Sequence, residues 1–144
     1  MYGNLDQLKK RISEDTLIQL TDDQDMGVIN EAVITEIAAG VDELIDGYLR
    51  GNYGLPLSPV PGLIQAIALD LYVYEIFGRR PTFGIPEAVD KKRAAQVKVL
   101  EKIQSGAVQL GSAGAVSAPA QTSKNSIQAV APKAVFDPDT LDRY

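Results

Sequence analysis

Three closely spaced prolines, Pro56, Pro59 and Pro61, precede the most apolar stretch of the chain. Proline fixes φ and disfavours helical conformation in the residue before it, so residues 55–59 are expected to form an extended loop. Proline suits the first turn of a helix, which predicts a helix over residues 61–77. Because that helix is apolar on nearly every side, we expect it to lie at the centre of the fold, covered by the others.

The remaining helices are predicted from capping residues and from apolar residues that recur every three or four positions. Helices are expected over residues 5–12, 28–49 and 87–104. The sequence Thr21-Asp22-Asp23-Gln24 has the form of a capping box, which predicts the start of the long helix. The stripe expected to bury that helix is Ile29, Val33, Ile37, Val41, Leu44 and Tyr48. The chain is therefore predicted to be an all-α bundle of four or five helices with a proline-rich loop and an extended C-terminal arm.

Two glycines, Gly40 and Gly47, interrupt the long helix. Each costs about 1 kcal/mol relative to alanine inside a helix. A close helix crossing at Gly40 and unwinding of the helix over residues 47–51 are the expected reasons for their presence.

Composition divides the chain into three parts. Residues 1–106 form the expected helical domain, and residues 107–134 have the Ala, Ser, Gly and Pro content of a flexible linker. Residues 135–144 regain apolar side chains, which is typical of a short docking segment. The alternative is a tail that folds back on its own domain. The residues expected to dock are Val135, Phe136, Leu141 and Tyr144.

Catalytic chemistry has few candidates here. The chain has no Cys and no His, so thiolate nucleophiles, zinc–thiolate sites and histidine general bases are excluded. Asp70 and Glu75 are five residues apart and do not share a helix face. We therefore expect no enzyme activity, no metal site and no cofactor. Asp70 is expected to be structural, paired with Arg50, Arg79 or Arg80 or bound by tyrosine hydroxyls.

Charge is unevenly distributed. Residues 1–50 hold 11 acids and 4 bases, a net charge of −7, whereas residues 87–106 hold 5 bases and 3 acids, a net charge of +2. The basic residues include the run Lys91, Lys92 and Arg93. Two interpretations are open. The acidic residues of 1–50 and the basic residues of 87–106 form ordinary solvated helix faces, or the acidic region of one copy binds the basic region of the next.

One run of residues carries a family resemblance. Ile45-Asp46-Gly47-Tyr48-Leu49, then Tyr53, Leu55-Pro56-Leu57, Val60-Pro61, an apolar helix and Arg79-Arg80 resembles the small head–tail connector (adaptor) proteins of Mu-like bacteriophages. The resemblance extends over residues 21–105 and returns in Phe136-Asp137-Pro138-Asp139-Thr140-Leu141.

The resemblance implies a structural protein of the virion neck, present in the host cytoplasm during assembly. It implies a ring of twelve copies between a portal protein and a tail-completion or stopper protein. No membrane contact is expected, because the most apolar stretch, residues 63–77, contains Asp70 and Glu75 and is shorter than the roughly 20 apolar residues that span a bilayer. Twelve copies at −5 would carry −60 (12 × −5), and genomic DNA would pass such an acidic lumen without specific binding. Three groups of residues are expected to contact other proteins. They are Leu55, Pro56 and Leu57 of the loop, the basic run Lys91, Lys92 and Arg93, and the docking residues of 135–144.

Two alternatives stay open. One is a small helical regulator that binds a partner through its C-terminal tail. The other is an enzyme that uses carboxylates alone.

Overall fold

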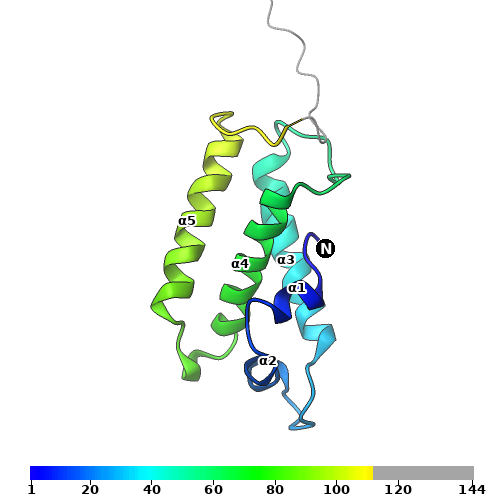
Figure 1. Cartoon of the computed structure of the whole chain (residues 1–144), viewed down its shortest axis with the longest axis vertical. Coiled ribbons are helices and arrows are strands. Elements are labelled where there is room, and N and C mark those ends of the chain that lie inside the picture. Colours follow the sequence, from blue (N-terminus) through cyan, green and yellow to red (C-terminus); the bar gives the residue numbers. More distant parts are fainter. Residues whose placement is uncertain (112–144) are drawn as a thin grey trace, which may run out of the picture.

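Over residues 1–111, which the computed structural model describes, the chain is all-α (Figure 1). The described elements are α1 (Leu5–Lys9), α2 (Glu14–Thr21), α3 (Glu31–Leu49), α4 (Gly62–Gly78), the 3₁₀ turn η1 (Pro81–Phe83) and α5 (Glu87–Gln104). The predicted fold class is confirmed. The expected C-terminal arm falls outside the described residues.

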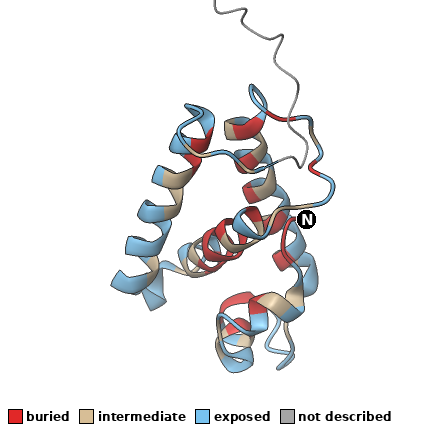
Figure 2. Ribbon diagram, turned by 45° about the horizontal axis from the view of Figure 1, so that its top comes forward, coloured by how far each residue is buried: buried red, intermediate tan, exposed pale blue. Residues whose placement is uncertain are grey.

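Helix α4 is the centre of the bundle. It contacts α1, α2, α3 and α5, and buried residues occur along most of its length (Figure 2). Tyr72, Ile67 and Ile76 are fully buried. The prediction of a central apolar helix is confirmed. Even so, no helix among residues 1–111 combines the length and the apolar character needed to cross a membrane.

Helices α3 and α5 flank α4 and run in the same direction (Figure 1). They are joined at their C-terminal ends, where the Asn52 side-chain amide donates to the Ile103 and Gln104 carbonyls at 3.1 and 2.7 Å. The buried residues of α5, Leu100 and Ile103, lie at this same end. Its first half is therefore more loosely packed than its second.

Helix α3 begins later than predicted. Asn30 is its N-cap, and the Asn30 side-chain oxygen accepts from the Val33 N–H at 3.3 Å. Thr21 instead ends α2, where its hydroxyl donates to the Leu17 carbonyl at 2.7 Å and accepts from the Asn30 N–H at 3.1 Å. The predicted capping box at Thr21 is wrong because that hydroxyl is used to close one helix and to position the start of the next.

The buried face of α3 is also rotated from the predicted stripe. Val41 is buried as expected, but Leu44 is 47% exposed. The expected reasons for the glycines were wrong as well, since α3 continues through Gly47 and no atom of residues 1–111 lies within 4 Å of a Cβ placed at Gly40 or Gly47. The residues that α3 does bury are Ile34, Ala38, Val41, Ile45 and Leu49.

Two connecting segments close the end of the bundle where α3 and α5 meet. The proline loop, whose Leu55–Pro56 and Ser58–Pro59 bonds are cis, buries Tyr53 and Leu57. After α5, Val108 and Leu110 pack on the core, and the Leu110 N–H donates to the Tyr53 hydroxyl at 3.0 Å. The chain therefore stays packed through residue 110, beyond the start at 107 expected for the linker.

Candidate protein-interaction surfaces

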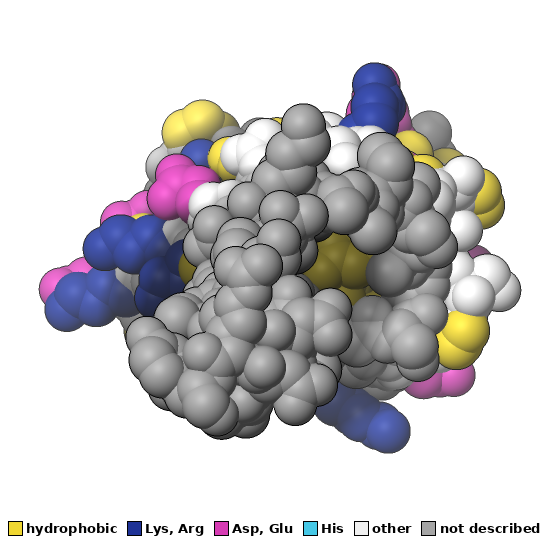
Figure 3. All heavy atoms as spheres, turned by 90° about the horizontal axis from the view of Figure 1, so that it is seen from above, with side chains coloured by type: hydrophobic (Ala, Val, Ile, Leu, Met, Phe, Trp, Pro, Cys, Tyr) yellow, Lys and Arg dark blue, Asp and Glu magenta, His cyan; other side chains and the backbone are white. Residues whose placement is uncertain are grey.

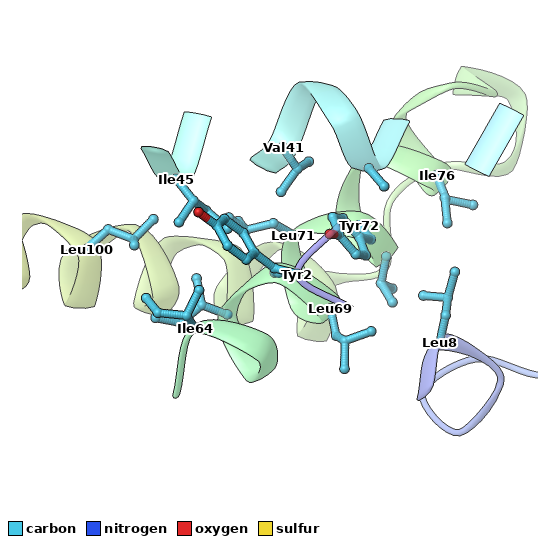
Figure 4. Packing of buried hydrophobic residues seen from close by; sticks show 14 of the residues in the cluster. Tyr2, Leu8, Val41, Ile45, Ile64, Leu69, Leu71, Tyr72, Ile76 and Leu100 are labelled. Atoms are coloured by element: carbon cyan, nitrogen blue, oxygen red, sulfur yellow. The ribbon is translucent and has the colours of Figure 1, made fainter. Parts of the chain in front are cut away.

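Two tyrosine hydroxyls hold the acidic side of α3 against the rest of the fold. Tyr2 donates to Asp46 and Tyr72 donates to Asp42, and both rings lie in the core beside Ile45 and Val41 (Figure 4). Burial, reinforced by the hydrogen bond to the carboxylate, raises the pKa of each tyrosine well above its usual range. These carboxylates therefore anchor the N-terminal segment and α4 to α3.

Asp70 is structural, as expected, but its arginine is a different one. Arg11 Nη1 lies 2.5 Å from Asp70 Oδ1, and Gln96 Nε2 donates to Oδ2 at 2.8 Å. This carboxylate ties the α1–α2 connection and α5 to the buried side of α4. Arg50, Arg79 and Arg80 were the sequence candidates, and none of them is its partner.

Arg79 and Arg80 instead hold the α2–α3 connection. Both guanidinium groups donate to Asp23, and they also donate to the carbonyls of Leu20 and Asp22. The hydrogen bond from Arg79 and the adjacent positive charges hold the pKa of the Asp23 carboxyl below its usual range. The two arginines at the end of α4 thus act as a clamp on a surface loop.

The candidate catalytic pair is not brought together. Asp70 faces Arg11 and α5, whereas Glu75 lines a groove on the side of α4 that faces α3. Within residues 1–111, every buried side-chain nitrogen or oxygen has a hydrogen-bond partner, and no group of three acidic side chains is arranged to hold a metal ion. The polar groups of the core are placed to hold the helices together.

An open groove of about 910 Å³ lies between α3, α4 and the turn that leads into α5. Its α3 wall is the second apolar face of that helix, the face predicted to be buried. Gly40 and Gly78 leave its sides without side chains, and Ile85 closes one end. The lining combines apolar side chains with the charged residues Glu36, Glu75 and Arg79, a mixture found where proteins bind other molecules. The groove is lined by Val33, Glu36, Ile37, Gly40, Val41, Leu44, Tyr74, Glu75, Gly78, Arg79 and Ile85.

The proline loop offers less surface than expected. Leu57 is buried in this chain's own core and Leu55 is half-buried against it, whereas Pro56 is exposed. The expectation that Leu57 contacts another protein is corrected because its side chain is already enclosed. Its apolar character is used for folding, which the sequence pattern alone did not distinguish from binding.

The basic run on α5 is divided between different environments. The Arg93 guanidinium lies over the Tyr74 ring, 4.6 Å from its centroid, and Lys92 borders a small pocket beside Asp70. Lys91 points to solvent and pairs with Glu87 at 2.6 Å, one helical turn away. Of the three, Lys91 is the one presented on the outer face. Val135, Phe136, Leu141 and Tyr144 lie outside the described residues.

Sequence reasoning missed the groove as a site. The exposed Leu44 and the unpacked Gly40 were read as core features, since a second apolar face on one helix looks like a wide buried stripe. Nothing in the sequence around Tyr74 or Ile85 indicated that these residues line a groove. The groove can be recognised only once the register of α3 against α4 is known.

The fold and these surfaces define a small all-α protein whose charged core groups are structural and whose exposed features suit protein contacts. Residues 2–129 match the family described as Bacteriophage Mu, Gp36. The chain belongs to this family. It is also similar to the Mu-like prophage FluMu protein gp36 of Haemophilus influenzae, with 29% identity over 111 residues, which are 77% of this chain and 76% of that protein. The predicted kinship with Mu-like phages is confirmed.

Proposed function

We propose that this chain is a head–tail connector, a structural protein of the virion neck placed between the portal and the tail. Membership of a Mu phage family over residues 2–129 carries the proposal. The resemblance of residues 45–80 to connector proteins supplies the location. The fully partnered core and the open groove support it further, because a subunit of an assembly needs a rigid body with surfaces for its neighbours.

The proposed assembly is a ring of twelve copies, which matches a twelve-fold portal. A closed ring of identical subunits uses heterologous contacts, in which one face of each copy meets a different face of the next. At −5 per copy, twelve copies carry −60 (12 × −5). A ring with a net negative charge repels the phosphate backbone overall, which suits a lumen through which DNA must pass.

The proposed neighbours are the portal protein on one side and a tail-completion or stopper protein on the other. Residues 135–144 carry apolar side chains that suit a docking segment, with Phe136 and Leu141 as anchors. Assembly in the host cytoplasm followed by residence in the virion neck completes the proposal.

Native mass spectrometry tests the proposal directly. The purified chain is measured alone and after mixing with portal rings from the same phage. We expect a complex in which the number of copies equals that of the portal, with no binding to the portal monomer. A chain that stays monomeric with portal rings, at concentrations where its own fold is intact, would contradict the connector role.

A further inference from the structure

The outer face of α3 carries small and acidic residues at regular helical spacing. We call it the acidic seam. The neighbouring acids Asp42 and Asp46 are turned away from it, toward the tyrosine hydroxyls. Within residues 1–111, neither Glu36 nor Glu43 takes part in an ion pair. The acidic seam consists of Ala32, Glu36, Ala39, Glu43 and Gly47, all of them exposed.

The outer face of α5 carries a second seam of opposite charge. Its residues recur every three or four positions and so share one face of the helix, opposite the buried Leu100 and Ile103. Lys and Arg side chains gather on the left of Figure 3, with Asp and Glu side chains beside them, on the side where α5 lies in Figure 1. The basic seam consists of Ala88, Lys91, Ala95, Lys98 and Lys102, all of them exposed.

The spacing of the two seams matches. Glu36 and Glu43 are seven residues apart, as are Lys91 and Lys98. Seven residues correspond to about 10.5 Å along a helix, so both carboxylates can meet both ammonium groups at once. A small residue lies between the charges on each helix, which allows the two backbones to approach closely.

The direction of the helices also fits. Within one copy α3 and α5 run the same way (Figure 1). Rotation about a ring axis along these helices preserves that direction, so α3 of one copy lies parallel to α5 of the next. In this register Lys102 falls opposite Gly47, which leaves room for the long side chain. Helices packed at about 20° keep such seams in contact over several turns.

Gly47 is otherwise unexplained. Glycine destabilises a helix interior relative to alanine. Nothing in residues 1–111 lies within 4 Å of a Cβ placed at Gly47, so no contact inside the described part of the chain requires its small size. A helix that approaches α3 from another copy would require it.

We propose that the acidic seam of α3 binds the basic seam of α5 of a second copy, and that this contact repeats around a ring. The inference rests on the proposed connector function, to which it adds the two faces that join the subunits. Glu36 pairs with Lys91, which exchanges its exposed intrahelical partner Glu87 for the new contact, and Glu43 pairs with Lys98. Because the two faces differ, the contact is heterologous and propagates until the ring closes.

Charge reversal in two separate chains tests the pairing. The first variant carries Glu36→Lys and Glu43→Lys, and the second carries Lys91→Glu and Lys98→Glu. Each alone places like charges across the contact, which should raise the concentration needed for assembly about tenfold or more. Mixed one to one, the variants restore opposite charges at every contact and should assemble on portal rings as alternating copies, with wild-type subunit number by native mass spectrometry.

A control matched to the first variant carries Asp15→Lys and Glu101→Lys, which also replace two acids by lysine, at exposed positions outside both seams. It should assemble like the wild type, and circular dichroism should report the same helix content for all variants. If both reversed variants assemble alone as well as the wild type, the seam contact is overturned while the ring stands. If the mixture fails although each variant is folded, the pairing is likewise wrong. If the wild type never assembles on portal rings, the connector function fails first and the seam contact falls with it.

Discussion

Asp70 is the acid on which the polar packing of α4 depends. Arg11 and Gln96, from different parts of the chain, both converge on its buried carboxylate. Such a group is costly to bury unless its charge and its lone pairs are satisfied. The sequence showed that Asp70 needed a partner, but Arg11 is distant in the chain and lies after a short helix whose position was not predictable. The sequence therefore predicted that the Asp70 carboxylate has a partner, but it did not predict which residue that partner is.

Asp70→Asn should lower the free energy of unfolding by about 1–3 kcal/mol, the range for losing a hydrogen bond to a charged group. Urea denaturation measures this. In a double-mutant cycle with Arg11→Met, the second change should cost much less once Asp70 is neutral. Equal, additive losses would show that the two side chains do not interact. Helix content should be unchanged.

Tyr2 and Tyr72 predict the behaviour of the protein in alkali. Their raised pKa values mean that the fold favours the neutral hydroxyls. This contribution to stability is fully present below the ordinary tyrosine pKa of about 10 and is lost as pH rises above it. Ultraviolet titration of tyrosinate should show these two groups ionising only as the helices unfold. In the Tyr72→Phe variant, the free energy of unfolding should fall less steeply than in the wild type as pH rises above about 10. An unchanged pH dependence would contradict the assignment.

At the scale of elements, the helices over 61–77 and 87–104 were predictable because proline marks each start. The orientation of α3 was not. This helix has two adjacent apolar faces, one against the core through Ile34 and Ile45 and one along the groove through Ile37 and Leu44. Periodicity shows that apolar residues share a side, but the choice of core face depends on contacts with α4. The groove was hidden for the same reason.

The central place of α4 is tested by truncating two leucines on that helix. Leu71 is 3% exposed, so Leu71→Ala should cost about 2–5 kcal/mol of unfolding free energy, the range for buried leucines. Leu63 lies on the same helix at 42% exposed, and Leu63→Ala should cost less than about 1 kcal/mol. Thermal or urea denaturation of both variants gives the comparison. Similar losses at the two positions would show that α4 is not the core helix.

Glycine substitutions provide an independent test of the unpacked face of α3. Gly40→Ala and Gly47→Ala should each stabilise the isolated chain by about 0.5–1 kcal/mol, since both lie inside a helix and an added Cβ meets no atom of residues 1–111 within 4 Å. Gly3→Ala is the contrasting control because its Cβ would lie 2.7 Å from Leu69 Cδ2. It should destabilise the chain. Loss of stability at Gly40 or Gly47 would mean that the face is already covered.

At the scale of the whole molecule, the folded body is expected to be separable from the C-terminal segment. The core of residues 1–111 is formed by side chains from Tyr2 to Ile103, with Val108 and Leu110 packed against it. A fully extended chain as long as residues 112–134 would span tens of ångströms at about 3.3 Å per residue, which is long enough for the proposed docking of residues 135–144 on another subunit.

Deleting residues 134–144 should leave the melting temperature nearly unchanged and weaken assembly on portal rings. Phe136→Ala with Leu141→Ala should reproduce most of the loss, because apolar anchors supply most of the energy of such contacts. Calorimetry and native mass spectrometry measure the two effects. Full assembly by the shortened chain would exclude a docking role for this segment.

The contact between Leu110 and Tyr53 has a consequence for polarity. It fixes the point where the described chain ends at the pole of the bundle where α3 and α5 also terminate (Figure 1). If copies stand side by side with these helices along a common axis, as in the proposed ring, Leu110 of every copy lies at the same rim. The opposite rim presents the α2–α3 connection and the turn around η1. Such a ring would have two chemically different ends, so each end could bind a different neighbour and the ring could enter a particle in one orientation only.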